Sequence, residues 1–229
     1  MQRLLLFLFF WIPLCLYAQT DDSTTVLDSS YLEDQFYIGI TYNFLLNRPE
    51  GVTEQNLSYG LQTGFIKDIP LNADRTVALG IGLGYAFNSY YTNLLVSELD
   101  NDFGYTIIGS DIDFRRNKVE THLVEMPLEL RWRNSTETDY KFWRIYTGLR
   151  LGYVVGGRSK FVSDEETVSF FNTDIRDFHY GLTLSFGYNT FNIHAYYALN
   201  NFFNDDVQIT DGEVIEVRPL RIGIIFYIL

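Results

Sequence analysis

Eight segments of this chain alternate with a period of two between large apolar side chains and small or polar ones. This period places successive side chains on opposite faces of a β-strand. The stretch from Val77 to Asn88 is representative, because its odd positions are all large and apolar and its even positions are only Ala, Gly and Asn. The sequence therefore predicts an all-β fold with strands at 36–46, 57–65, 77–88, 124–132, 143–153, 178–187, 191–200 and 220–228.

The face that carries the large residues distinguishes a membrane barrel from a soluble one. Aromatic residues make up 17% of the chain, whereas the opposite strand faces are crowded with Gly, Ala and Ser. Small side chains fit the narrow interior of a closed barrel, and large apolar ones fit lipid. We predict an eight-stranded antiparallel transmembrane β-barrel of the outer-membrane type. A soluble lipocalin-like barrel is the alternative, because alternation alone does not say which face is wet.

The predicted connections alternate strictly between short and long. The short ones are 68–75, 134–141 and 189–190, and the long ones are 47–56, 89–118, 157–177 and 200–216. Outer-membrane barrels have short periplasmic turns and long outer loops, so both termini are predicted to face the periplasm. Aromatic residues beside the short turns are predicted to form the periplasmic girdle, namely Trp132, Trp143, Tyr188 and Phe191. The opposite girdle is predicted to contain Phe44, Tyr59, Phe87, Phe178 and Tyr197.

The N-terminal 18 residues have the composition of a signal peptide. Arg3 precedes an apolar run at 4–18, and Ala18 occupies the predicted cleavage position. Residues 19–35 are acidic and contain no base, which predicts a flexible periplasmic leader ahead of a barrel at 36–229. Cleavage would remove Cys15, the single cysteine, so the fold is expected to need no disulfide.

Charge and motifs argue against several function classes. The formal net charge of −12 disfavours nucleic acid as a partner. We find no zinc-ligand spacing, phosphate-binding glycine loop or nucleophile elbow, and we expect no cofactor, no metal, no small-molecule substrate and no enzymatic activity. Ser185 and His194 are predicted to pair across a turn at 189–190. A structural hydrogen bond is favoured over an activated nucleophile, because no orienting acid lies nearby.

Charged residues on the small-residue faces are predicted to form a structural ion-pair network in the lumen. Its expected members are Glu125, Glu129, Arg131, Arg144, Arg150 and Arg221. A hairpin that closes with Arg133 opposite Phe142 would place Glu125 opposite Arg150. A register slipped by two residues, which would instead face Glu129 with Arg144, is the alternative. Charges held away from bulk water need partners, so the network is expected to plug the barrel.

Six segments resemble the PorT proteins of Bacteroidota, whose gliding-motility relatives are called SprT. The resemblance implies a small outer-membrane barrel that is required by the type IX secretion system, which exports adhesins and proteases, with a link to gliding motility. An eight-stranded lumen is too narrow for folded cargo, so an accessory or assembly role follows. The expected partners are outer-membrane lipid and other type IX secretion components. The segments are EDQFYIGITYNFL (33–45), LSYGLQTGFIKDIPLN (57–72), ALGIGLGYAFNSYY (78–91), KFWRIYTGLRLGYV (141–154), FHYGLTLSFGYNTFNIHAYYALN (178–200) and RPLRIGIIFYIL (218–229).

Two other functions stay open at the level of sequence. Some small outer-membrane barrels modify lipid A, and others are structural or adhesive. Mass spectrometry of lipid A from a deletion strain would identify the enzyme, and a secretion assay would distinguish the secretion component from the structural barrel.

Overall fold

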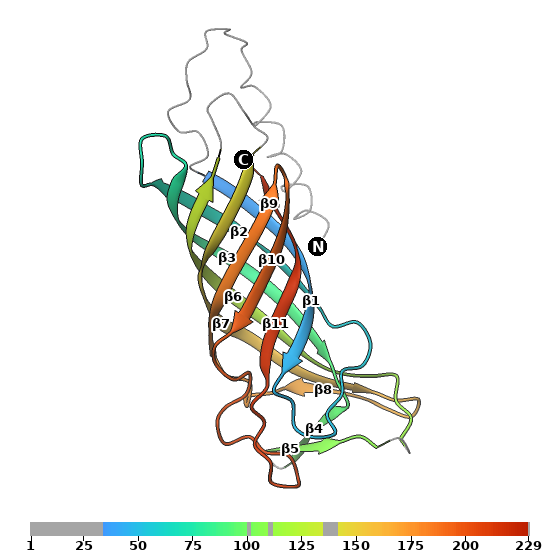
Figure 1. Ribbon diagram of the computed structural model, residues 1–229. Helices are drawn as coiled ribbons and strands as arrows, with labels where there is room; N and C mark the ends of the chain where they lie inside the picture. Colours follow the sequence, from blue (N-terminus) through green and yellow to red (C-terminus); the bar gives the residue numbers. More distant parts are fainter. Residues whose placement is uncertain (1–33, 100–101, 110–111, 135–141, 229) are drawn as a thin grey trace, which may run out of the picture.

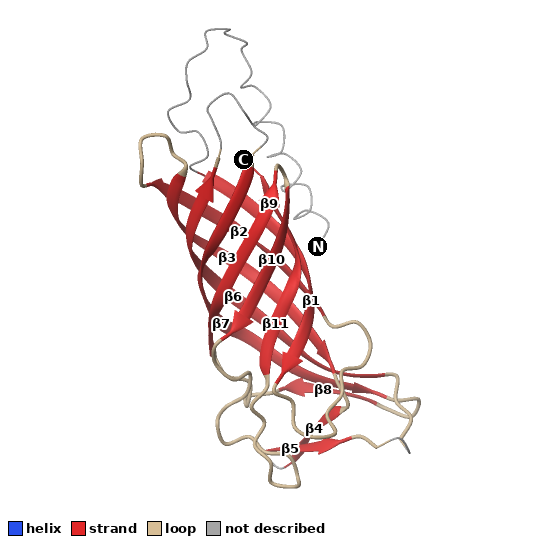
Figure 2. Ribbon diagram, viewed as in Figure 1, coloured by secondary structure: helices blue, strands red, loops and turns tan. Residues whose placement is uncertain are grey.

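A computed structural model describes residues 34–99, 102–109, 112–134 and 142–228. The predicted signal peptide and the leader up to residue 33 lie outside the described residues. Figure 1 shows a tilted barrel with short turns at one end and longer connections at the other, and Figure 2 shows that its elements are strands. The strands are β1 (Asp34–Leu46), β2 (Tyr59–Pro70), β3 (Val77–Tyr91), β4 (Leu94–Leu99), β5 (Asp102–Ile107), β6 (Arg116–Arg133), β7 (Trp143–Val162), β8 (Thr167–Phe171), β9 (Phe178–Tyr188), β10 (Phe191–Ala198) and β11 (Arg218–Ile228).

Eight of these strands close into a ring. They follow the order β6-β3-β2-β1-β11-β10-β9-β7, every neighbouring pair is antiparallel, and β6 pairs with β7 to complete the circle. The predicted eight-stranded antiparallel barrel is therefore confirmed. No helix among the described residues is long and apolar enough to cross a membrane.

Several strands are longer than the alternation predicted. β1 begins at Asp34, so Asp34 and Gln35 belong to the barrel and not to the predicted leader. β2 ends at Pro70, which shortens the first predicted turn. β6 begins at Arg116 and β7 continues to Val162, because their period-two pattern persists with charged residues in place of apolar ones. A third strand, β8, pairs with the end of β7.

The two faces of the barrel wall differ as the alternation predicts. The apolar side chains face outward and are exposed, as with Ile38 at 54%, whereas the neighbouring Tyr37 is 1% exposed. The lumen needs small residues because large ones cross it: a Cβ at Gly84 would overlap the hydroxyl of Tyr37. Pro127 interrupts the pairing of β3 with β6. Ile81 pairs with Leu128 and Gly84 pairs with Glu125, but the two positions between them are not paired. This matches the local unpaired site expected of a proline that lacks an N–H.

The four long connections pack together into a cap over one end of the barrel. The second connection forms a hairpin of β4 and β5, which the sequence pattern did not predict. Its Tyr105 hydroxyl donates to Asp174 in the third connection at 3.0 Å, and burial raises the pKa of Asp174 above its usual range. The cap has its own apolar core of Leu45, Val52, Tyr90, Leu94, Val96, Tyr105, Val119, Ile175, Phe202, Phe203, Val207, Ile209, Ile215 and Val217.

Candidate functional site

The register of β6 and β7 decides which charges meet inside the barrel. The structure pairs Arg133 with Arg144, so Glu125 faces Gly152 and Glu129 faces Gly148. The predicted register, with Arg133 opposite Phe142 and Glu125 opposite Arg150, is wrong by two residues. The alternative register, with Glu129 opposite Arg144, differs from the predicted one in the other direction along the strand, and it is also wrong. The hairpin closes differently because Asn134 caps it: the Trp143 N–H donates to Asn134 Oδ1 at 2.7 Å, and the Asn134 N–H donates to the Trp143 carbonyl at 3.2 Å.

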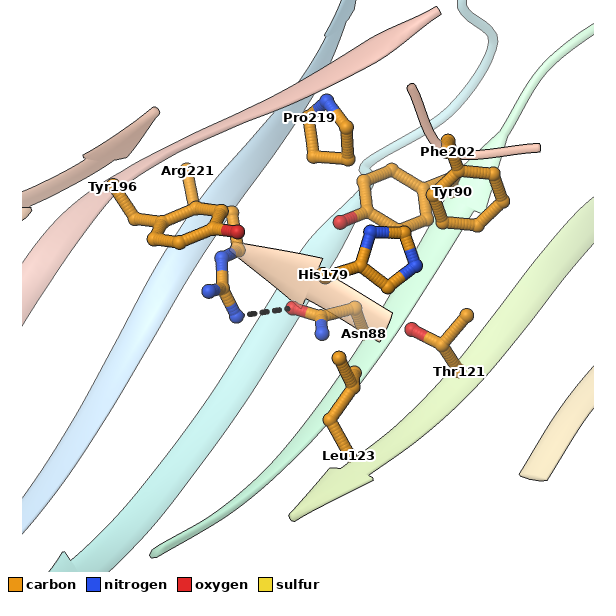
Figure 3. Close-up of a pocket in the computed structure, with 9 residues that line it drawn as sticks. All are labelled: Asn88, Tyr90, Thr121, Leu123, His179, Tyr196, Phe202, Pro219 and Arg221. Atoms are coloured by element: carbon orange, nitrogen blue, oxygen red, sulfur yellow. Dashed lines mark hydrogen bonds between the residues drawn. The ribbon is translucent and has the colours of Figure 1, made fainter. Parts of the chain in front are cut away.

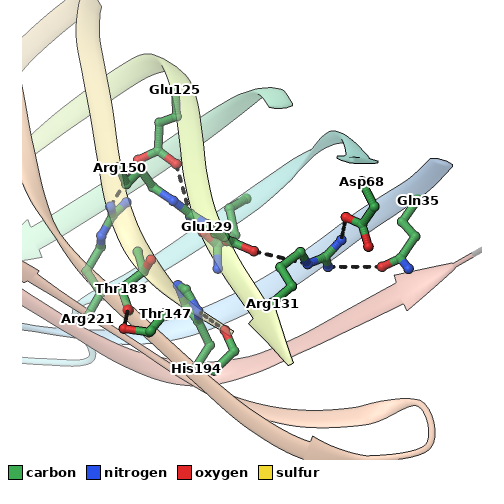
Figure 4. A network of polar contacts seen from close by, with 12 residues as sticks. Gln35, Asp68, Glu125, Glu129, Arg131, Thr147, Arg150, Thr183, His194 and Arg221 are labelled. Carbon is green, nitrogen blue, oxygen red and sulfur yellow. Dashed lines mark hydrogen bonds and ion pairs between the residues drawn. The ribbon is translucent and has the colours of Figure 1, made fainter. Parts of the chain in front are cut away.

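Glu125 nevertheless reaches two arginines near the middle of the lumen. Its Oε1 lies 2.9 Å from Arg221 Nη2 and its Oε2 lies 3.3 Å from Arg150 Nη1. Arg150 also donates to the side-chain oxygen of Gln62 on β2. The contact with Arg150 is diagonal across the β6–β7 pair, and long side chains can span that separation. Figure 4 shows this cluster of side chains projecting from opposite walls of the barrel.

A second cluster lies toward the short-turn end. Asp68 on β2 accepts from Arg131 with one carboxylate oxygen and from Arg133 with the other, the latter at 2.6 Å. The side chains of all three residues are 0% exposed or nearly so. Gln35 accepts from the second guanidinium nitrogen of Arg131 at 3.0 Å. The backbone carbonyl of Arg75 accepts from Arg133 Nε at 2.9 Å.

Glu129 joins the two clusters. Its Oε2 lies 3.5 Å from Arg131 Nε and its Oε1 lies 3.7 Å from Arg150 Nη2. The charges then alternate without a break along the lumen, in the order Arg133, Asp68, Arg131, Glu129, Arg150, Glu125 and Arg221. We call this series the lumen chain. Each carboxylate in it contacts two arginines, which is the arrangement that makes buried charges tolerable.

Arg144 belongs to the predicted network but not to the lumen chain. Among the described residues it contacts no carboxylate, and its guanidinium lies 4.5 Å from the ring of Phe142. Other arginines also stack on rings: Arg131 lies 3.9 Å from the ring of Tyr146, and Arg221 lies 3.8 Å from that of Tyr196. Ring faces attract cations and add to the packing of the lumen.

Sequence reasoning missed four polar residues of the lumen: Gln35, Gln62, Asp68 and Arg133. Gln62 was placed on the lumen face but was not counted as a partner. Asp68 was assigned to a turn, yet it continues the period-two series of Gly60, Gln62, Gly64 and Ile66. Extending the predicted strand by three residues, from 65 to 68, would have placed its carboxylate inside the barrel.

The lumen chain fills the described part of the lumen with side chains that are almost fully buried. Toward the cap a cavity of about 20 Å³ is lined by side chains that include Asn88, His179 and Arg221, and Figure 3 shows these pointing toward one another. One water needs about 10–15 Å³ by this measure, so the cavity has room for a single water and none for a substrate. Among the described residues, buried side chains thus occupy the lumen, and the cap packs over one end of it.

Ser185 and His194 lie directly opposite each other on β9 and β10, as the two-residue turn predicted. Ser185 Oγ lies 2.8 Å from His194 Nδ1, and both side chains are buried in the lumen. Among the described residues no carboxylate hydrogen-bonds to His194. The described part of the chain also has no cluster of three or more His, Cys, Asp or Glu residues that could hold a metal ion.

The four predicted periplasmic girdle residues all lie on the outward face at the short-turn end. Trp132, Trp143, Tyr188 and Phe191 are 43–67% exposed. Trp143 packs against Phe186 and Tyr188 with ring centroids 5.2 and 5.1 Å apart. Amphipathic rings at this level are typical of a membrane–water interface.

One family model agrees with this architecture. A family model described as an outer membrane protein beta-barrel domain matches residues 17–204. Ail, the attachment invasion locus protein of Yersinia pestis, solved with the heparin analogue sucrose octasulfate, is 15% identical over 86% of this chain and 98% of that chain, with a TM-score of 0.37. A triple mutant of Rhodopseudomonas blastica porin is 9% identical over 85% and 99%, with a TM-score of 0.22. No curated protein matches the sequence. At these scores the two solved structures carry no argument about this chain.

Proposed function

Because the chain belongs to the outer membrane protein β-barrel domain family, we propose that it is a non-enzymatic barrel required for protein export by the type IX secretion system. In this role it is an accessory or assembly component of a larger machine. The family places the chain in the outer membrane. The resemblance of six segments to PorT proteins supports the link to secretion and, through the SprT relatives, to gliding motility.

The filled lumen is the observation that supports an accessory role. The lumen chain spans the interior with side chains that are almost fully buried, and the cap covers one end with an apolar core. An extended polypeptide could enter only by breaking these contacts, and a folded one could not enter at all. The exposed cap and the lipid-facing wall are then the surfaces on which other secretion components bind.

Deletion of the gene is expected to abolish export of cargo with type IX signals, because the proposed role is essential to the machine. Other outer-membrane proteins should reach the membrane in normal amounts. Extracellular protease activity and surface adhesin levels measure export, and the wild-type gene supplied in trans is the control. Normal export in the deletion strain would contradict the assignment and leave the structural or adhesive barrel as the better reading. A changed lipid A mass spectrum in that strain would instead favour the enzyme.

The short turns and both termini are proposed to face the periplasm, with the cap outside the cell. The unequal connections and the aromatic girdle at the short-turn end support this orientation. An epitope tag at Asp102, in the β4–β5 hairpin of the cap, should therefore bind antibody on intact cells. A tag at the C-terminus should bind only after the outer membrane is permeabilised. Antibody binding to the C-terminal tag alone on intact cells would reverse the orientation.

A further inference from the structure

The outward face of β6 and β7 carries a group of cations where these strands pass beyond the barrel toward the cap. Arg116 and Lys118 lie on β6, and Arg158 and Lys160 lie on β7. Their neighbours in sequence turn the other way: Val119 belongs to the cap core, and Ser159 accepts a hydrogen bond from Asn172 inside the cap. We call these four residues the basic rim.

Among the described residues, Lys118 is the one cation of the basic rim that forms an ion pair with a carboxylate. Lys118 is the direct cross-strand partner of Lys160, and such partners have Cβ atoms only about 5 Å apart. Glu120 is the one carboxylate on this face of β6, β7 and β8, and it contacts Lys118 at 2.5 Å while facing Arg158. Arg158 otherwise stacks on Phe171, with 4.8 Å to the ring centroid. The basic rim thus gathers four cations beside one carboxylate of these strands, in a chain whose net charge is −12.

The basic rim lies at the level along the membrane normal where lipid headgroups are expected. His122 pairs with Phe87, a residue of the aromatic belt at the cap end, and their rings lie 5.0 Å apart. Lys118 lies four residues farther along β6, which is about 13 Å along the strand and less along the membrane normal because barrel strands tilt. Phosphate groups of lipid lie directly beyond an interfacial aromatic belt.

An open cavity beside the basic rim offers a place for the rest of a lipid. It has a volume of about 420 Å³ and is lined by Asn56, Leu57, Tyr59, Tyr91, Arg115 and Arg116. Leu57 is 64% exposed, and Tyr91 is the cross-strand partner of Lys118. Arg115 is already paired with Asp164 at 2.7 Å, which leaves Arg116 as the cation that the cavity shares with the basic rim. Apolar side chains and cations thus lie side by side.

We propose that the basic rim binds the phosphate of a phosphorylated glycolipid of the lipid A class in the outer leaflet, with an acyl chain against Leu57 and Tyr59. Arg116 and Arg158 are exposed and Lys160 is half-buried, so these three would contact the phosphate, and Lys118 would add its charge from beneath. An anion between Lys118 and Lys160 would also relieve their mutual repulsion. The proposal rests on the proposed orientation, because only with the cap outside does the rim meet this leaflet.

The test measures lipid binding to the purified full-length mature barrel in detergent, by native mass spectrometry and by the unfolding temperature. Phosphorylated lipid A should bind and raise the unfolding temperature, whereas chemically dephosphorylated lipid A should bind weakly. The double variant Arg158→Gln/Lys160→Gln should bind phosphorylated lipid A about 25-fold more weakly, since each cation near an anionic headgroup contributes about fivefold. Lys67→Gln is the matched control, because Lys67 is an exposed lysine at the short-turn end, and it should bind like the wild type.

Without lipid, Lys160→Gln should be at least as stable as the wild type, since it removes a like-charge neighbour of Lys118. If the double variant does not fold, Arg158→Gln alone should still weaken binding about fivefold. Equal binding by wild type and variants, or equal binding of dephosphorylated lipid A, would overturn the proposal. An equal rise in unfolding temperature with inorganic phosphate would identify a free-anion site and also overturn the lipid assignment. These measurements need no secretion, so their failure is separate from failure of the proposed function.

Discussion

Replacement of Asp68 by alanine is expected to lower the free energy of unfolding of the barrel by about 3–5 kcal/mol. Asp68 is the only carboxylate that contacts Arg133 within the lumen chain, and it shares Arg131 with Glu129. Its loss leaves Arg133 buried, and among the described residues the backbone carbonyl of Arg75 is then its remaining hydrogen-bond partner. Bulk water does not reach these arginines in the wild type, because the side chains on both sides of Asp68 are 0% exposed.

Heat-modifiable gel migration of the refolded barrel measures this effect, together with the fluorescence of Trp132 and Trp143. Asp74→Ala is the matched control, because Asp74 is an exposed acid in the turn that follows β2. It should unfold within about 0.5 kcal/mol of the wild type, as is usual for surface substitutions. If Asp68→Ala unfolds at the same temperature as the control, Asp68 does not hold the two arginines in the lumen.

The strands and their faces were predictable because each depends on local pattern. In a membrane barrel, successive residues face the lipid and the crowded lumen in turn, so the type of side chain indicates which way each residue points. Tyr37 faces the lumen and Ile38 faces outward. The strand ends were harder to predict. β6 and β7 continue toward the cap while remaining paired, so Arg116 and Lys160 extend the period without the apolar residues that marked the predicted strands.

The register of β6 and β7 and the structure of the cap could not be predicted from local sequence pattern. A slip of two residues keeps every side chain on its face, so the hydrophobic pattern of 124–132 and 143–153 fits either register equally well. The observed register is the one in which Asn134 and Trp143 hydrogen-bond to each other where the hairpin closes, and the apolar pattern of the strands does not predict this contact. The cap combines residues such as Val52, Tyr105 and Phe203 from three separate connections, and no period links them. The lumen chain was predicted in part. Its charged residues could be recognised on the small-residue faces, but their partners depend on the register and could not.

Removal of Glu125 is expected to destabilise the barrel more than removal of either arginine beside it. Glu125→Met leaves Arg221 with no carboxylate in the lumen chain, whereas Arg150→Met leaves Glu125 with Arg221 and Glu129 with Arg131. Arg221→Met likewise leaves Glu125 paired with Arg150. Stranding a buried charge costs about 3–5 kcal/mol, while a charge that keeps one good partner costs less. The expected order of unfolding temperatures is therefore Glu125→Met below Arg150→Met and Arg221→Met.

The double variant Glu125→Met/Arg221→Met tests whether the alternation of charge causes this order. It removes the last two members of the lumen chain together, so that Arg133, Asp68, Arg131, Glu129 and Arg150 still alternate. Replacing a whole buried ion pair by apolar side chains of similar volume is often neutral. The double variant should thus be more stable than Glu125→Met alone, although it carries one more substitution. Glu125→Met/Arg150→Met is the contrasting pair, because it still strands Arg221 and should recover less. Additive losses in both double variants would show that the side chains act by packing, without the charge alternation that the geometry indicates.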